Sequence, residues 1–356
     1  MTNKYCALMG QKPSHIPHWE HWSNPDAETF ITGIDHYEHP SLAKQKMNEL
    51  YPELYLSLPD NDNPILEPSN DVNSENSTTR WGDSETATFE HGEKIFKDDE
   101  SVLNFSPLKQ GDFSDFPVVE NHDYRDAGKL YQTMLVRHKL SGVSETPKYS
   151  IDMPWYYNTI FMWPVLTFGW EGFLLNCLED RFDPIMREFA EISRRAVAAL
   201  AKLPANFILF HDDICNTAGP VCNREWMNKY ILPCYEEFWA TVHDTGKRVI
   251  FIGDGNLDAY VEDIIKCGAD GIISEPYTNF KQLAANHPEI MMAGEGDNRI
   301  LSYGSKDDIK KMVITMTETA RDVPGYFYCI GNHIPWNVPV EATKYYLDLC
   351  KELGTK

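Results

Sequence analysis

The stretch that decides the fold is RVIFIGDGNLDAY, residues 248–260. An apolar, β-branched run ends at Gly-Asp-Gly (253–255) and continues into a helical pattern. A glycine-rich turn between a strand and a helix is typical of dinucleotide binding, and Glu275 follows about 20 residues later. However, Asp258 puts a negative charge where a pyrophosphate would bind, and the motif falls late in the chain. We therefore interpret the turn as one strand end in a repeated strand–helix pattern.

The same alternation runs through the second half of the chain. Apolar runs at 207–213, 249–253, 271–274, 290–294 and 326–331 alternate with helical patterns at 183–203, 223–244, 256–268, 278–286, 305–322 and 340–353. Upstream runs at 16–22, 54–58 and 159–166 supply three more strands. Such alternation predicts right-handed βαβ units, and eight strands favour a (β/α)8 TIM barrel over an open sheet. We expect one domain over residues 1–356.

One segment interrupts the rhythm. Residues 60–123 are acidic and rich in Asn, Asp, Ser and Pro, and the stretch near 76–96 alternates like a β-hairpin. We expect an irregular acidic insertion, with an inserted β-hairpin, on the barrel.

Charge and cysteine content limit the function. The chain carries 54 acidic and 32 basic residues, a net charge of −22, which argues against nucleic-acid and anionic-membrane partners. Its eight cysteines show no CxxC spacing, and no apolar run has the length of a signal peptide core or a membrane span. We expect a soluble cytoplasmic protein with reduced thiols.

Acids and histidines gather where the expected strands end, which is where barrel enzymes place their catalytic groups. They are His18, Glu20, His21, His211, Asp212, Asp213, Asp254, Glu275, Glu295, Asp297, Asn332 and His333. An Asp after a strand is also a common helix N-cap, so Asp254 alone decides little. The whole ring predicts a site at this rim.

Several segments then resemble a known family. They are FHDDICNTAGP (210–220), VIFIGDGN (249–256), CGADGIISEP (267–276) and GNHIPWNVPVEA (331–342). Together they resemble the uroporphyrinogen decarboxylase superfamily, and most closely its corrinoid-dependent methyltransferase branch. The opening IPHWEHWSNPDAETFITGIDHYEHP (16–40) is similar to ether-cleaving methyltransferases of anaerobic O-demethylase systems.

Departures from the family pattern refine what the resemblance implies. Decarboxylases of this superfamily grip a polycarboxylate with an arginine after the first strand, and residues 16–25 contain none. Thiol-methylating relatives bind zinc through an HxC pair where Ile-Gly-Asp (252–254) stands, and through a cysteine near Asn332 that is also missing. The resemblance leaves Asp254, Glu275 and His333 as candidate zinc ligands, an oxygen-rich set suited to a Lewis acid at an oxygen.

We therefore expect a methyltransferase that moves a methyl group from an O-methyl substrate, such as a methoxylated aromatic, to Co(I) of a separate corrinoid protein. The candidate catalytic residues are Asp254, Glu275, His333, His211 and Asp213. The candidate substrate-binding residues are His18, Glu20, Trp22, Tyr156, Asn332 and Trp336. The cobalamin is expected on the partner because the chain lacks the DxHxxG motif of cobalamin carriers; Asp35-His36 continues as YEHP.

Two alternatives stay open. One is transfer from a methylcorrinoid to tetrahydrofolate or another acceptor. The other is a non-catalytic barrel that binds aromatic ligands or a partner.

Overall fold

The centre of the protein is a parallel sheet. The computed structural model describes residues 3–52, 54, 95–109, 128–132, 135 and 156–355. The strands are β2 (Tyr156–Asn158), β3 (Phe207–His211), β6 (Arg248–Gly253), β7 (Gly271–Ser274) and β8 (Met291–Ala293), in the order β2-β3-β6-β7-β8. Every neighbouring pair is parallel. The strands are apolar along nearly their whole length because both faces are covered, as in α/β proteins.

Further pairings extend this sheet beyond β8. Parallel bridges join Met292 to Tyr326 and Tyr328 to His18. β1 (Trp22–Ser23) pairs with β9 (Ile334–Pro335), and the Glu20 amide donates to the Leu54 carbonyl at 3.1 Å. The order is that of a TIM barrel. The parallel α/β sheet is confirmed. The segment that would close the barrel between Leu54 and β2 lies outside the described residues, so the closed barrel stays a prediction.

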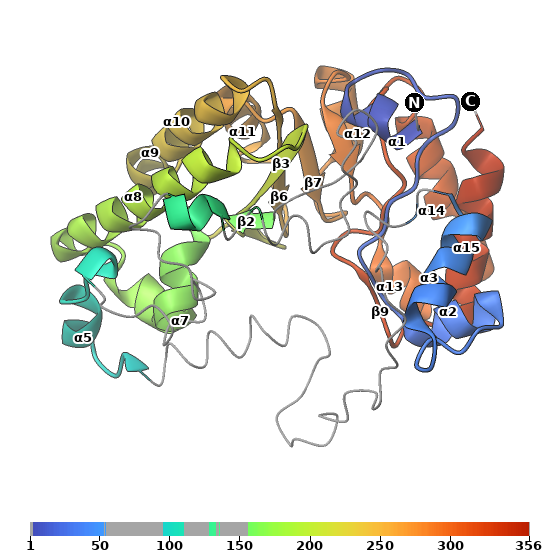
Figure 1. Cartoon of the computed structure of the whole chain (residues 1–356), viewed down its shortest axis with the longest axis horizontal. Coiled ribbons are helices and arrows are strands. Elements are labelled where there is room, and N and C mark those ends of the chain that lie inside the picture. The colour runs from blue at the N-terminus through green and yellow to red at the C-terminus, as the bar shows by residue number, and fades with distance from the viewer. Residues whose placement is uncertain are drawn as a thin grey trace.

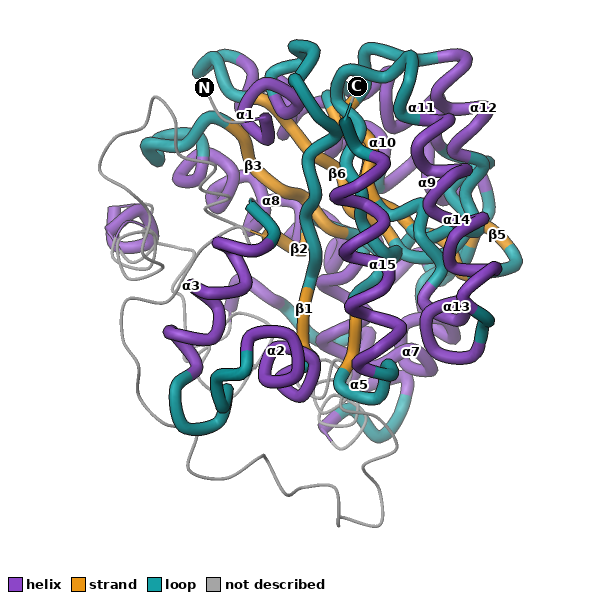
Figure 2. The backbone as a smooth tube through the Cα atoms, turned by 90° about the vertical axis from the view of Figure 1, so that its right-hand side faces the viewer, coloured by secondary structure: helices purple, strands orange, loops and turns teal. Residues whose placement is uncertain are grey.

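Helices cover the outside of the sheet. They are α7 (Met162–Asn176), α8 (Asp183–Leu200), α9 (Arg224–Tyr230), α10 (Leu232–His243), α11 (Val261–Cys267), α12 (Phe280–Asn286), α13 (Asn298–Tyr303), α14 (Lys306–Thr319) and α15 (Val340–Leu353). In Figure 1, α8 to α11 lie on one side of the strands and α12 to α15 on the other. Figure 2 shows α15 and α14 at the front of that view, and the two helices pack against each other. None of the helices in the described ranges is long and apolar enough to cross a membrane.

Shorter elements complete the structure. They are α1 (Asn3–Leu8), α2 (Pro25–Thr32), α3 (Pro40–Leu50), α5 (Asp99–Leu103), the 3-10 turns Pro107–Lys109 and Asp180–Phe182, and the two-residue strands β4 (Cys215–Asn216) and β5 (Gly219–Pro220). The sequence patterns missed α2 and α3, although Asn24 followed by Pro25 is a standard helix start. They also missed α13.

One expected strand is wrong. Residues 159–166 were expected to form a strand, but the strand is β2 at Tyr156–Asn158 and the apolar run belongs to α7. This helix is buried around most of its surface, so its sequence lacks the period that distinguishes a helix from a buried strand. Asp212 fixes its start, because the carboxylate accepts the Met162 amide at 2.8 Å.

The expected insertion is only partly described. Residues 95–109 contain α5 and a 3-10 turn. The expected hairpin near 76–96 lies almost entirely outside the described residues.

Two hydrophobic clusters define the inside and outside of the sheet. The inner cluster includes Trp19, Phe207, Leu209, Ile250, Ile273, Met291, Ala293, Phe327 and Cys329. The intervening residues, among them Ile208, Phe210, Phe251, Ile272, Met292 and Tyr328, pack with the helices. Successive strand residues therefore alternate between the inside and the helix layer. This alternation decides which strand-end side chains can meet.

Candidate functional site

The inner register places several of the expected site residues at one rim. Continuing the alternation past Leu209 and Ile250 brings His211, Asp213 and Asp254 to the inner side, and past Ile273 it brings Glu275. Hydrogen bonds then join residues from four different strand ends.

The first part of this network is a histidine–aspartate pair. His211 Nε2 lies 2.8 Å from Asp213 Oδ1, and His211 Nδ1 lies 2.8 Å from Asn158 Oδ1. Both ring nitrogens have an oxygen partner, so the imidazole is held in a fixed position between β2 and the residues after β3. Burial works to raise the pKa of Asp213, but the charge and hydrogen bond of His211 outweigh it, so this pKa is lowered. Asp213 therefore carries negative charge at the rim.

The second part starts at the glycine-rich turn. The Asp254 amide donates to Asp213 Oδ1 at 3.1 Å, and Asp254 Oδ2 accepts from Asn332 Nδ2 at 3.0 Å. Asn332 Oδ1 lies 2.8 Å from His333 Nδ1. Because the Asn332 amide donates to Asp254, its oxygen accepts the Nδ1 proton of His333. The lone pair of the imidazole is then on Nε2.

His333 is held as a neutral imidazole. Burial, followed by the neighbouring His21, lowers the pKa of His333 to about 4. The His21 and His333 rings lie 5.2 Å apart between centroids. Asn332 has a φ of 68°, a left-handed conformation that Asn tolerates better than most side chains. This backbone conformation at Asn332 lets the side chains of Asn332 and His333 both lie at the rim.

Glu275 has different surroundings from the two aspartates. Burial raises its pKa, the charge of Asp213 adds to that, and a hydrogen bond from the Gly255 amide to Oε2 at 2.7 Å opposes it. Its other carboxyl oxygen, Oε1, makes no hydrogen bond within the described residues. A carboxyl group with a raised pKa and one oxygen to spare is suited to donate a proton.

The glycine-rich turn does not hold a phosphate. Its amides are already bonded inside the protein: Gly255 to Glu275, Asn256 to the Asn216 carbonyl at 3.0 Å, and Leu257 to Thr278 Oγ1 at 3.0 Å. A Cβ on Gly255 would lie 2.5 Å from the Asn216 backbone, so glycine is needed for close packing of two loops. The helix begins only at Val261. Dinucleotide binding at this turn is therefore rejected.

The three candidate zinc ligands are not grouped closely in the described part of the chain. In the described part of the chain, no three His, Cys, Asp or Glu side chains come together as a set able to hold a metal ion. Asp254 is hydrogen-bonded to Asn332, Glu275 to Gly255, and the Nδ1 atom of His333 to Asn332. Each of the three candidates already has a hydrogen-bond partner, so zinc at these residues stays a prediction from which we derive no chemistry.

Two expected substrate-binding residues belong elsewhere. Glu20 is buried and accepts from Tyr346 OH at 2.6 Å, from the Ile330 amide at 3.0 Å and from His18 at 2.6 Å. Tyr346 lies on α15, so His18 and Glu20 face the helix layer and not the rim. Their hydrogen bonds join the first strand to α15, and their contact with substrate stays a prediction.

The other three aromatic residues expected to bind substrate are not part of the hydrogen-bond network described above for the rim. Trp22 is partly buried against the core, and Trp336 is exposed beyond β9. Tyr156 contributes backbone pairing in β2, and its side chain lies outside the described part of the structure.

Asp212 and Glu295, two strand-end acids from the ring, also face outward. Asp212 is fully buried and accepts from Tyr235 OH at 2.7 Å and from two amides near α7. Burial raises its pKa to about 6. The side chain of Glu295 accepts from Tyr326 and from Thr319 of α14.

Two residues were missed as candidate catalytic or binding residues. His21 shares the inner register with Trp19, and its strand-end position was the signal. Part of its ring is exposed, but the protein around the rest lowers its pKa by burial, against the opposing charge of Glu20. Asn158 was missed because the strand that carries it was expected a few residues later.

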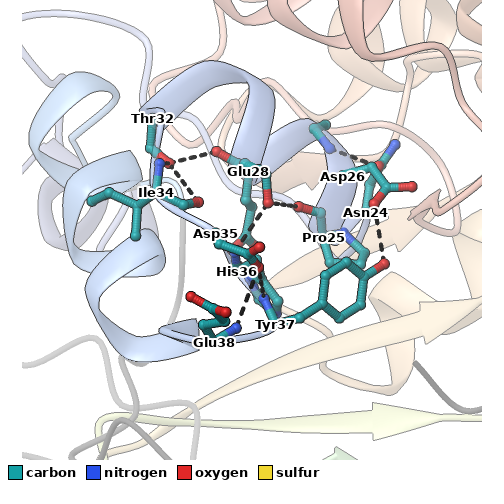
Figure 3. A network of polar contacts seen from close by, with 12 residues as sticks. Asn24, Pro25, Asp26, Glu28, Thr32, Ile34, Asp35, His36, Tyr37 and Glu38 are labelled. Carbon is teal, nitrogen blue, oxygen red and sulfur yellow. Dashed lines mark hydrogen bonds and ion pairs between the residues drawn. The ribbon is translucent and has the colours of Figure 1, made fainter. Parts of the chain in front are cut away.

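The Asp35-His36 pair has a structural role. His36 is buried and its Nδ1 is hydrogen-bonded to the buried carboxylate of Glu28 on α2. Tyr37 OH donates to Asp26 Oδ1 at 3.1 Å, and the Asp35 carboxylate accepts the Tyr37 amide, as Figure 3 shows. His36 is therefore committed to holding the segment after α2.

Comparison with known proteins now assigns the chain to a family. The family model described as Uroporphyrinogen decarboxylase (URO-D) matches residues 175–353, which is half of the chain. The chain belongs to the URO-D family. The matched region contains every rim residue described above except His21 and Asn158.

A solved structure has the same overall fold. It is a methyltransferase from Methanosarcina mazei, with a TM-score of 0.56, 13% sequence identity and coverage of 99% of each chain. At this identity the likeness shows the fold alone. No curated protein matches the sequence.

Proposed function

We propose that this URO-D family member is a methyltransferase that moves a methyl group from an O-methyl substrate to Co(I) of a separate corrinoid protein. The observation that carries the proposal is Glu275, whose carboxyl group has a raised pKa and keeps one oxygen without a hydrogen bond among the described residues. It lies beside the network that joins Asp213, Asp254, Asn332 and His333. The Methanosarcina protein that shares this fold is a methyltransferase, which supports the same class of reaction.

The chemistry of an aryl methyl ether explains the need for such a group. Phenolate is a poor leaving group, so breaking the methyl–oxygen bond requires a proton at the ether oxygen as the bond breaks. Glu275 would supply this proton, leaving a phenol, while the methyl group passes to the corrinoid of the partner. The corrinoid supplies the nucleophile. Glu275 regains its proton from solvent.

The other rim residues would orient the substrate. Asp254 and Asn332 are fixed by their mutual hydrogen bond and can direct a hydroxyl group on the ring. His333, neutral with a lone pair on Nε2, can accept a hydrogen bond from the substrate. Fixed polar groups raise rates by holding the methyl carbon in line with its acceptor.

Decarboxylation of a porphyrinogen is disfavoured by the same geometry. Asp213 is ionised and Asp254 lies beside it at the rim. A polycarboxylate would meet like charge there, and the segment 16–25 offers no arginine to offset it.

The test uses free cob(I)alamin as the corrinoid, together with the protein and a panel of methoxylated aromatics such as 2-methoxyphenol. Loss of Co(I) absorbance and release of the demethylated phenol only when all three components are present supports the proposal. Demethylation without a corrinoid would overturn it. If a methylcorrinoid is instead demethylated by tetrahydrofolate in the presence of the protein, the direction of transfer is the reverse of the one proposed. Binding of the aromatics without turnover under every condition would favour a non-catalytic barrel.

Zinc and the carrier-bound cobalamin stay predictions, which the same preparation tests. Metal analysis of purified protein measures zinc directly. Absorbance of the purified protein reports any retained cobalamin, and we expect none because the cofactor is expected on the partner.

A further inference from the structure

A separate pocket lies on the outer side of the β7 and β8 strand ends. It measures about 590 Å³ and is bounded by the segment after β7 (276–281), the segment after β8 and one face of α14. This volume is in the usual range for small-molecule sites. The α14 residues that line it, Asp308, Lys311, Met312, Thr315 and Met316, recur at helical spacing and so form one continuous wall.

Gly294 separates this pocket from the rim. Its φ is 100°, and a Cβ there would lie 1.8 Å from the Ser274 carbonyl oxygen, so only glycine fits. The chain turns at this residue, and Glu295 consequently points toward α14. Its carboxylate accepts from Tyr326 OH at 2.5 Å and from Thr319 Oγ1 at 2.9 Å.

The acids that line the pocket are all engaged within the protein. Asp297 is paired with Arg299 at 2.6 Å, and Asp308 accepts from Ser305 Oγ at 2.6 Å. Burial raises the pKa of Glu295, while its hydrogen bonds from Tyr326 and Thr319 oppose this. These carboxylates therefore already have hydrogen-bond or ion-pair partners inside the protein, although Asp297 and Asp308 remain ionised.

The two lysines of the pocket are in the opposite situation. Lys281 and Lys311 both line it, and neither ammonium makes a hydrogen bond or ion pair with any described residue. The charge of Lys311 helps to lower the pKa of Asp308, but it does so from beyond ion-pair distance and after the hydrogen bonds from Ser305. In a chain with a net charge of −22, two such cations beside one pocket are unusual. These two ammonium groups are the cationic hydrogen-bond donors that the described lining of the pocket offers to a ligand.

The floor of the pocket is apolar. Phe280, Met312 and Met316 are buried there, and Ile300 is partly buried beside them. Methionine side chains adapt to apolar groups of different shape. A cationic entrance above an apolar floor suits an amphipathic anion.

We propose that this pocket binds a small organic anion, a carboxylate attached to an apolar or aromatic body. The carboxylate lies between Lys281 and Lys311, and the body rests on Phe280, Met312 and Met316. This site is distinct from the rim, and its existence does not depend on the methyl-transfer proposal.

The test uses 4-fluorobenzoate as the probe and follows its fluorine NMR signal during titration with the full-length protein. We expect saturable binding with a Kd of about 1 mM or tighter. The double variant Lys281→Gln/Lys311→Gln should raise Kd at least about tenfold. The control is Lys310→Gln, which removes the same charge from the adjacent exposed position of α14 without touching the pocket, and it should leave Kd unchanged.

Three further arms separate this pocket from other modes of binding. Glu275→Gln should leave Kd unchanged, because Glu275 lies at the rim; a matching loss would show that the probe binds there and would overturn the proposal. The neutral 4-fluorobenzamide should bind at least about tenfold more weakly, since it cannot pair with the lysines. Inorganic phosphate, an anion without an apolar body, should not displace the probe at equal concentration. Displacement by phosphate, equal losses in Lys310→Gln, or no binding by the unaltered protein would each overturn it.

Discussion

Glu275→Gln is the sharpest test of the proposed chemistry. The substitution keeps the size of the side chain, and the amide oxygen of glutamine can still accept the hydrogen bond from Gly255. It removes the only feature that the mechanism needs, which is a transferable proton. General acid catalysis contributes about 10²- to 10⁴-fold, so the rate of methyl transfer should fall by that factor, a barrier increase of about 3–5 kcal/mol.

The pH dependence gives a second signature. Burial raises the pKa of Glu275, so the proton donor persists at a higher pH than in an ordinary glutamate. The rate should be highest below this pKa and should fall as the pH rises through it, because only the protonated form donates. In Glu275→Gln this limb of the profile should disappear.

The assay is a single-turnover measurement of Co(I) absorbance with excess methoxylated aromatic. The matched control is Glu289→Gln, an exposed glutamate just before β8 at the opposite end of the sheet, which should keep the full rate. Urea unfolding should show that Glu275→Gln is within about 1 kcal/mol of the unaltered protein. A rate within about threefold of normal, with the high-pH limb intact, would refute the role of Glu275.

Three further predictions concern neighbouring parts of the structure. Asp254→Ala should slow methyl transfer at least about 100-fold in the same assay while changing the urea-unfolding free energy by less than about 1 kcal/mol, because the residue lies at a partly open rim; normal turnover would remove Asp254 from the site. Glu20→Ala should instead cost about 3–5 kcal/mol in urea unfolding, since it strands the buried Tyr346 hydroxyl and the Ile330 amide; an unchanged stability with a raised KM would restore its role in substrate binding. His333, with a pKa of about 4 in the folded state, stays neutral while the unfolded chain takes up a proton below about pH 6.5, so stability conferred by its neutral state is lost on acidification. His333→Gln should abolish about 2 kcal/mol of the stability difference between pH 7 and pH 5, measured by unfolding at both values; an identical difference in both proteins would contradict the lowered pKa.

Several strand and helix positions in the second half followed from the sequence because their patterns are strong and local, whereas the strand expected at 326–331 is present only as isolated bridges. The β6 run of Arg248–Gly253 and the helix α15 at Val340–Leu353 are examples. The α7 region could not be predicted in the same way. Its start depends on Asp212, whose carboxylate reaches the amide of Met162 from a different strand, and no local pattern records that contact.

The rim was predictable to the extent that parallel strands end at a common edge. His211, Asp213, Asp254, Asn332 and His333 are joined there by hydrogen bonds as the spacing of the strands suggested. The sequence did not reveal which neighbours face the other way. For the strand that contains His18 and Glu20, the position of Trp19 in the inner cluster and the contact of Glu20 with Tyr346 on α15 show which face is inside.

The backbone conformation of Gly294 determines that two glutamates at adjacent strand ends have different surroundings. Glu275 and Glu295 are both glutamates at adjacent strand ends, both partly buried and both with a pKa raised first by burial. Simple alternation after Ile273 and Ala293 would turn both inward. The positive φ of Gly294 reverses the second one, so that Glu295 is bonded to Tyr326 and becomes part of the outer pocket. An Ala at this position would place its Cβ 1.8 Å from the Ser274 carbonyl oxygen, so the turn requires glycine. Gly294 therefore keeps Glu275, the proposed proton donor at the rim, apart from Glu295, which lines the outer pocket.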